Sequence, residues 1–328
     1  MERQISSHLT NLYFREKNMY IDWQLSDVCN FGCAYCNFES RGGLHGWPTF
    51  EQATKLVDDI VAHSDHAYRT YNLLGGEPTL WRDFGALCEY IRERDPESII
   101  QVLTNGSRTV RWWEKYAPVM DKIVISHHVK IAGTTDHVVD VVRTCYPVSN
   151  VSVQILVDHE CFDQVVEHFD QLIAALPGIS ITPKKGETEL GSGVWMPYTW
   201  EQESWFGRAM MVSRANLHNT NPIPKQHHTP HRRDLWASDG VTEWKTSNKE
   251  IIIGNHNHFE GWSCNIGKDM IAIKSSGEIR PASACFGEVN MGNYRKGEQI
   301  EWPQQPFICK YEGCYCGADI EVEKHAPK

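Results

Sequence analysis

Hydrophobic and polar positions follow two periods along the first half of the chain. Short apolar or β-branched runs, which predict strands, alternate with longer segments whose apolar residues recur at helical spacing. Six strands are predicted, at residues 20–25, 69–74, 99–104, 121–126, 150–157 and 178–182. This alternation predicts an α/β fold with a parallel sheet. Because six strands are predicted rather than eight, we expect an open, partial (β/α)6 barrel.

The segments between the predicted strands each have one apolar face. The first helix is the clearest, because Thr49 and Gln52 form a capping box ahead of an apolar stripe. Further helices are predicted near residues 80–94, 108–117, 135–145 and 160–176. Cys88, Cys145 and Cys161 lie on or beside these apolar faces, and we expect them to be core residues.

The alternation stops near residue 183, which predicts three regions. They are the barrel at 1–183, an aromatic- and histidine-rich connector at 184–262, and a small cysteine-rich α+β domain at 263–328. Six tryptophans in the connector imply burial or ligand contact rather than a flexible linker. A hairpin is predicted within the third region, at residues 270–280.

Composition narrows the possible partners and the compartment. A formal net charge of -10 over 328 residues argues against tight nonspecific binding of nucleic acid. No apolar run approaches the roughly 18 residues that span a bilayer, and the N-terminus lacks the apolar core of a signal peptide. We therefore expect a cytoplasmic protein whose 11 cysteines are free or metal-bound rather than disulfide-paired.

The segment CNFGCAYC, residues 29–36, contains three cysteines in eight positions. Cys29, Cys33 and Cys36 follow the first predicted strand, at the edge where open α/β folds bind ligands. Three cysteines around a cubane iron-sulfur cluster leave one iron without a protein ligand, which suits a cluster that binds a substrate or cofactor directly. A zinc site with a distant fourth ligand, or chance, remains the alternative.

This C-x3-C-x2-C spacing resembles the motif of radical S-adenosylmethionine (radical SAM) enzymes, in which an aromatic residue, here Tyr35, precedes the last cysteine. The segment LLGGEP after the second predicted strand also resembles the family. A glycine pair lets backbone approach a ligand closely. The resemblance implies that this GGEP motif contacts the methionine amino group, and it gives cofactor-binding roles to Gly75, Gly76, Glu77 and Pro78.

Two more strand ends resemble the family. LTNG contributes Thr104 and Asn105, and VISHH contributes Ser126 as an expected contact to the cofactor's carboxylate. Relatives often have Ser-Leu-Asp where this chain has Ser126, His127 and His128. His127 and His128 are therefore catalytic candidates, for substrate contact or proton donation. The alternative is that neither histidine acts in catalysis: one faces inward and is structural, and the other packs under the rim.

The resemblance implies reductive cleavage of SAM to methionine and a 5'-deoxyadenosyl radical, which abstracts a hydrogen from the substrate. It implies a [4Fe-4S] cluster, SAM and an external one-electron donor such as a flavodoxin or ferredoxin. The substrate, a small molecule or a peptide, and the reaction type, oxidoreductase or isomerase, stay open. A leader-guided peptide maturase is the disfavoured alternative, because about 19 residues precede the first predicted strand.

Five more cysteines gather near the C-terminus: Cys264, Cys285, Cys309, Cys314 and Cys316. A metal centre would supply folding energy to a region with little apolar material. The pattern resembles the twitch or SPASM-type extension of radical SAM enzymes, although seven residues rather than four separate Gly277 from Cys285. The resemblance implies one auxiliary [4Fe-4S] cluster for electron transfer. We expect Cys264, Cys285 and two of the last three as ligands, with Cys316 favoured over Cys309; zinc is the alternative.

Two other classes of function compete with an enzyme. An iron-sulfur electron carrier would need clusters but neither the GGEP motif nor a six-stranded barrel. A zinc-stabilised binding protein would keep the cysteines but hold no iron. Arg232 and Arg233, in HHTPHRRD, form either a solvated basic loop or a patch that binds phosphate or carboxylate.

Overall fold

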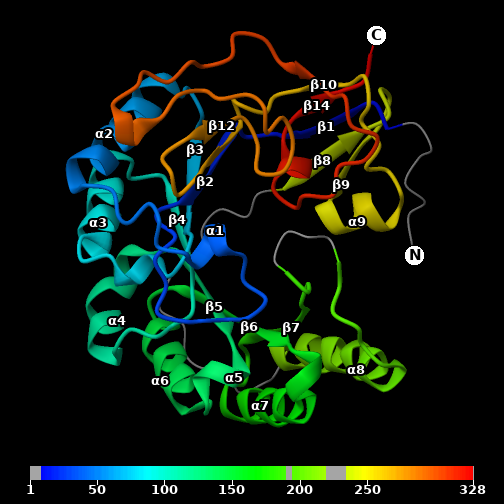
Figure 1. Cartoon of the computed structure of the whole chain (residues 1–328). Coiled ribbons are helices and arrows are strands. Elements are labelled where there is room, and N and C mark those ends of the chain that lie inside the picture. Colours follow the sequence, from blue (N-terminus) through cyan, green and yellow to red (C-terminus); the bar gives the residue numbers. More distant parts are fainter. Residues whose placement is uncertain (1–8, 190–193, 219–233, 328) are drawn as a thin grey trace.

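The computed structural model describes residues 9–189, 194–218 and 234–327 (Figure 1). Its main sheet has eight strands in the order β12-β11-β2-β3-β4-β5-β6-β7. The six parallel strands are β2 (Asn18–Gln24), β3 (Tyr68–Leu74), β4 (Ile99–Thr104), β5 (Lys122–His127), β6 (Asn150–Val157) and β7 (Ser180–Lys185). The predicted α/β fold and its six strands are confirmed.

The predicted hairpin in the third region is also confirmed. β11 (Met270–Ile273) pairs antiparallel with β12 (Ile279–Arg280). β11 also pairs with β2 in parallel register, so this hairpin extends the barrel sheet at its first strand. Gly277 in the turn has φ +88°, and a Cβ there would lie 2.6 Å from side-chain atoms of Asn293 and Arg295. The turn therefore requires glycine.

Helices follow the strands and cover the outer face of the sheet (Figure 1). They are α2 (Phe50–His63), α3 (Phe84–Arg94), α4 (Val110–Tyr116), α5 (Val129–Ala132), α6 (Asp136–Cys145), α7 (Phe162–Ala175) and α8 (Trp200–Leu217). The short α1 (Phe38–Arg41) lies instead toward the middle of the molecule, after the loop that follows β2 (Figure 1). Thr49 and Gln52 form the predicted capping box of α2. Cys88 and Cys145 are fully buried in the core as expected, and Cys161 is half-buried beside it.

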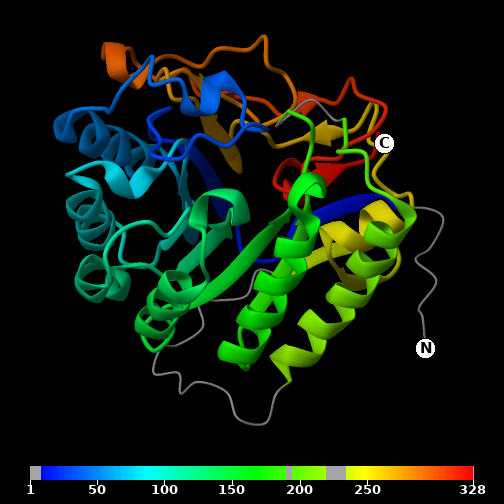
Figure 2. The ribbon, with the colours of Figure 1, turned by 60° about the horizontal axis from the view of Figure 1, so that its bottom comes forward.

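Side-chain alternation along the strands separates the core from the barrel interior. In β6, Val151, Val153 and Ile155 are buried beneath the helices, whereas Ser152 and Gln154 project to the opposite face. Figure 2 shows α7 and α8 side by side along the outside of the barrel. The apolar core thus lies between sheet and helices, and the interior is left for polar residues.

The last parallel strand begins two residues later than predicted. Gly178 turns the chain with φ +82°. The Asn216 side chain of α8 donates to the carbonyls of Leu176 and Ile179 at 3.0 and 2.8 Å. Because these carbonyls bond to a side chain rather than to β6, the ladder starts at Ser180.

A second, antiparallel sheet has the order β13-β10-β14-β1-β8-β9. Its strands are β1 (Asn11–Phe14), β8 (Leu235–Ser238), β9 (Glu243–Thr246), β10 (Ser263–Cys264), β13 (Phe307–Ile308) and β14 (Lys324–His325). The remaining elements are α9 (Asn248–Ile253) and the 3-10 turns η1 (Pro78–Leu80), η2 (Ala117–Val119), η3 (His159–Cys161), η4 (Tyr294–Lys296) and η5 (Asp319–Glu321). Strands from both ends of the chain and from 184–262 share this sheet, and the division into three regions stays a prediction.

The connector tryptophans have different surroundings. Trp205 on α8 packs edge-on against Phe162 and Phe169 of α7. Trp200, by contrast, is 78% exposed, so it is not buried. Arg232 and Arg233 lie outside the described residues. Within the described part of the chain, no helix combines the length and the apolar character needed to cross a bilayer.

Candidate active site

Cys29, Cys33 and Cys36 lie on the loop that follows β2, as predicted. All three line one cavity of about 390 Å³. The backbone N–H of Cys36 donates to the carbonyl of Cys33 at 3.1 Å, and the Cys29 sulfur accepts from the N–H of Phe31 at 3.3 Å. These local bonds fold the loop so that three thiols with C-x3-C-x2-C spacing reach the same cavity.

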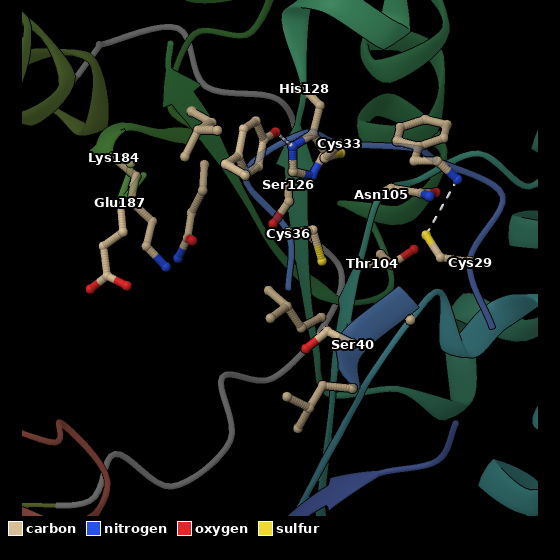
Figure 3. Close-up of a pocket in the computed structure, with 18 of the residues that line it drawn as sticks. Cys29, Cys33, Cys36, Ser40, Thr104, Asn105, Ser126, His128, Lys184 and Glu187 are labelled. Carbon is tan, nitrogen blue, oxygen red and sulfur yellow. Dashed lines mark hydrogen bonds between the residues drawn. The ribbon is translucent and has the colours of Figure 1, made fainter. Parts of the chain in front are cut away.

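The walls of this cavity come from the carboxyl-terminal halves of the six parallel strands and the loops after them. One lining residue from each strand is Gln24, Leu74, Thr104, Ser126, Gln154 and Lys184, in strand order. Figure 3 shows Lys184 and Glu187 across the cavity from Cys29. Ligand binding at this edge is the rule for open parallel sheets.

The glycine pair after β3 packs directly against the cysteine loop. Gly75 has φ +92° and Gly76 has φ +53°. A Cβ on Gly75 would lie 2.7 Å from the carbonyl oxygen of Ser26, and one on Gly76 would lie 2.2 Å from that of Val28. Both glycines line the cavity. Glycine is required here because backbone meets backbone without room for a side chain.

Glu77 and Pro78 occupy a different position from the glycines. Glu77 is fully buried and does not line the cavity. Its carboxylate accepts hydrogen bonds from the Thr104 hydroxyl at 2.7 Å and from the Asn105 N–H at 2.6 Å. Burial raises its pKa, and these hydrogen bonds oppose the rise. Pro78 is buried at the start of η1. The structure therefore places Glu77 as a brace between two loops, and its contact with a cofactor stays a prediction.

The loop after β4 ties this brace to the cysteine loop. Asn105 donates from its side chain to Asn30 at 2.9 Å, and Asn30 donates to the Ser107 hydroxyl at 2.9 Å. Thr104 and Asn105 both line the cavity. The GGEP turn, the LTNG loop and the cysteine loop are thus one connected unit.

The two candidate histidines point in opposite directions. Ser126 and His128 line the cavity, whereas His127 does not. His127 Nε2 lies 2.9 Å from His168 Nδ1 on α7, beneath the helical layer. Consecutive residues of a strand face opposite sides, so His127 is excluded from this cavity by strand geometry. The candidacy of His127 for substrate contact is corrected accordingly.

His128 and Tyr35 form a pair at the cavity wall. The Tyr35 hydroxyl is hydrogen-bonded to His128 Nδ1, and the rings stack with centroids 5.9 Å apart. Burial, with the nearby Lys184 ammonium, lowers the pKa of His128 to about 4. The imidazole is therefore neutral at pH 7, able to donate or accept a hydrogen bond.

Several lining residues were not singled out in the sequence. Gln24, Gln154 and Lys184 are polar residues near strand ends, facing inward by strand alternation. The alternation of side-chain direction along each strand could have identified them from the sequence.

Arg295 does not line the cavity, but it holds the chain on both sides of the cysteine loop. Its guanidinium donates to the carbonyls of Leu25 and His45, both at 2.7 Å. This contact from a distant part of the chain was not predictable from the sequence.

The first three cysteines have an arrangement that suits a cubane cluster. Burial raises the pKa of all three thiols, to about 11 for Cys36, whose neighbouring thiols add to the rise. In the described part of the chain, no three histidine, cysteine or carboxylate side chains converge as ligands of one metal ion would. The thiolates of a cubane cluster each bind a different iron and need no common point. Three thiols beside a glycine-lined cavity suit such a cluster.

The five C-terminal cysteines lie in one region, and their thiols affect one another to different extents. Burial raises the pKa of the Cys285 thiol, and the nearby Asp319, Cys264, Cys314 and Cys309 raise it further. The Cys316 thiol, whose pKa is raised to about 11 by burial and then by Asp319, itself raises the pKa of Cys314. Cys309 affects two other thiols, Cys264 and Cys285, whereas Cys316 affects one, Cys314. Proximity thus gives more support to Cys309, and the choice between Cys316 and Cys309 stays a prediction.

Comparisons with known proteins identify the family and the fold. Residues 23–186 match the family described as the Radical SAM superfamily. Among solved structures, native anSMEcpe with bound AdoMet is similar with a TM-score of 0.52 and 15% identity, over 85% of this chain and 78% of that one. Streptococcus suis SuiB bound to precursor peptide SuiA is similar with a TM-score of 0.54 and 13% identity, over 88% of this chain and 65% of that one. At these identities the structural likeness shows the fold alone.

Proposed function

Because this chain belongs to the radical SAM superfamily, we propose that it is an enzyme that binds a [4Fe-4S] cluster and SAM in the cavity after β2 and abstracts a hydrogen from its substrate. The observation that carries the proposal is the meeting of three thiols with the Gly75–Gly76 turn in one cavity. When bound, the cluster and SAM supply the electron and the 5'-deoxyadenosyl radical that the reaction needs.

The chain's own residues bind and orient these groups. We assign Cys29, Cys33 and Cys36 to the cluster. Tyr35, Gly75, Gly76, Asn105 and Ser126 line the cavity where SAM would lie, and Thr104 connects it to the buried Glu77. His128, neutral and hydrogen-bonded to Tyr35, is the candidate for substrate or cofactor contact.

A second cluster is proposed for the last region, as in twitch or SPASM-type domains. Cys309 lies near Cys264 and Cys285, and Cys314 lies near the same two thiols, which supports Cys264, Cys285, Cys309 and Cys314 as its ligands. Cys316, which lies near Cys314, is the alternative to Cys309. A site with four cysteine ligands has no open iron, which favours electron transfer over substrate binding. We also propose a cytoplasmic location, where thiols stay reduced, and an external flavodoxin or ferredoxin as electron donor.

Gln24, Gln154 and Lys184 face the cavity and can bind polar groups of a substrate, beside an apolar wall from Leu74, Leu103 and Leu156. A small polar molecule is the first candidate. A peptide is the second, since one fold neighbour is bound to a precursor peptide. The substrate class does not affect the test of the cofactor chemistry.

The test compares the anaerobically reconstituted protein with a variant in which Cys29, Cys33 and Cys36 are alanine. With SAM and dithionite, the parent should form methionine and 5'-deoxyadenosine, and the triple variant should form neither while retaining some iron. An electron carrier would show the iron without 5'-deoxyadenosine. A zinc protein would lack the visible absorbance that dithionite bleaches. Either result would overturn the proposal.

A further inference from the structure

Lys324 in β14 is one of the most deeply buried side chains in the molecule. It is 2% exposed, although lysine is among the residues least often buried. Its strand pairs with β10, and Lys324 is the direct cross-strand partner of Cys264. Cross-strand partners project from the same face of a sheet with their Cβ atoms close together. The ammonium group is thus placed on the cysteine side of the small sheet.

The hydrogen bonds of Lys324 are those of a charged ammonium. Nζ donates to the carbonyl oxygens of Asp319 at 2.7 Å, Val322 at 2.9 Å and Ile320 at 3.2 Å. An ammonium has three donors, and here each has an acceptor. No carboxylate of the described residues forms an ion pair with it. A buried charge without an opposite charge is costly, so the fold favours a negative group nearby.

The groups within its reach that would become negative on binding a cluster are thiols. Cys264 is the cross-strand partner of Lys324, and the ammonium lies near enough to Cys314 to act on that thiol as well. The same ammonium therefore acts on thiols from two different segments. Asp319 also lies beside these thiols, but its two carboxylate oxygens accept from the backbone N–H groups of Ser283 and Ala284.

We propose that Lys324 is the fixed counter-charge of the C-terminal iron-sulfur site, which stabilises the bound cluster and raises its reduction potential. The inference rests on the proposed auxiliary cluster. A cluster with four thiolates is anionic, and one-electron reduction by the external donor makes it more so. A positive charge in a region shielded from water stabilises the reduced form more than the oxidised form. Lys324 therefore acts on the cluster through its charge and is not one of its ligands.

The test uses the full chain with Cys29, Cys33 and Cys36 changed to alanine, so that any iron belongs to the C-terminal site. Iron and sulfide are counted, and a mediated redox titration is followed by electron paramagnetic resonance. Lys324→Gln removes the charge and keeps two donors; Lys324→Arg keeps the charge. We expect Lys324→Gln to lower the reduced-to-oxidised ratio at fixed potential about tenfold, or about 59 mV for one electron. Lys324→Arg should stay within about twofold.

Lys310→Gln is the matched control. Lys310 follows Cys309 directly, but it is exposed and paired with Glu288, so solvent should screen its charge. Removing the charge of Lys310 should change the reduced-to-oxidised ratio of the cluster by less than about twofold.

Each outcome decides the inference. An unchanged potential in an iron-loaded Lys324→Gln protein would overturn it. Loss of iron in Lys324→Gln but not in Lys324→Arg would support it, because charge would then hold the cluster. Loss in both would show that side-chain shape matters and charge does not. A parent without iron would refute the auxiliary cluster itself, which is a distinct failure.

Discussion

The buried carboxylate of Glu77 accepts a hydrogen bond from the backbone N–H of Asn105 at 2.6 Å and so joins the turn after β3 to the loop after β4. A second oxygen contact, from the Thr104 hydroxyl, completes this junction. The cavity wall beside the three cysteines therefore depends on a residue that does not line it. A change at Glu77 can therefore weaken ligand binding in two ways: by loosening the two loops that it joins, or by removing a direct contact with the ligand.

We expect Glu77→Ala to lower the free energy of unfolding by about 2–3 kcal/mol, because buried donors lose their acceptor. SAM affinity should fall as well, because Thr104 and Asn105 lose their position. Urea unfolding and calorimetric titration with SAM, both anaerobic, measure the two effects. Glu93→Ala, an exposed position on α3, should change stability by less than about 0.5 kcal/mol. Weakened SAM binding at unchanged stability would instead assign Glu77 a direct contact.

The histidine pair beneath α7 predicts a loss of stability in mild acid. Burial, with the charge of His168, lowers the pKa of His127 from 6.5 to about 4. Between these two pH values the unfolded chain binds more protons than the folded one, so stability falls as the pH falls through this window. The contribution of His127 is at most about 3 kcal/mol, at 1.36 kcal/mol per pKa unit.

The contribution of His127 to this pH dependence is tested by urea unfolding of His127→Gln at pH 7 and pH 5. The variant should be less stable at pH 7, because it loses packing, but its stability should fall less between the two pH values. Equal pH dependence in parent and variant would show that His127 does not carry the effect.

The elements with local signals were predictable from the sequence. The six parallel strands follow from their apolar runs, and α2 follows from its capping box, because both depend on residues close in the chain. The cysteine and glycine motifs likewise lie in single loops. Strand parity could also have separated His127 from His128, since Ser126 faces the cavity and alternation then directs His127 outward.

The remaining features depend on contacts between distant segments. β10 and β14 have two residues each, too few for a periodic signal, and their pairing joins parts of the chain about sixty residues apart. The burial of Lys324 and the grip of Arg295 on the cysteine loop are properties of that assembly. Composition alone would have assigned both side chains to the surface.

Gly76→Ala tests the close packing of the GGEP turn against the cysteine loop. The added Cβ would meet the Val28 carbonyl oxygen at 2.2 Å, at a φ of +53° that alanine disfavours. We expect a loss of more than about 2 kcal/mol in stability and reduced iron at the first site. Gly207→Ala, in α8 with no heavy atom within 4 Å of the new Cβ, should stabilise by about 0.5–1 kcal/mol. A tolerated Gly76→Ala with full iron would contradict the packing argument.

The ligand set of the C-terminal site gives the last prediction, because the sequence favoured Cys316 and the structure favours Cys309. Cys309 is among the neighbours of both Cys264 and Cys285, whereas Cys316 affects one thiol, that of Cys314. Single Cys→Ser changes are made in the background that lacks Cys29, Cys33 and Cys36, and iron is counted after anaerobic reconstitution. Serine at 264, 285, 309 or 314 should remove the remaining iron, and Cys316→Ser should retain it. Iron loss in Cys316→Ser with retention in Cys309→Ser would restore the original preference, since a C-x-C pair would then direct both thiolates to the cluster.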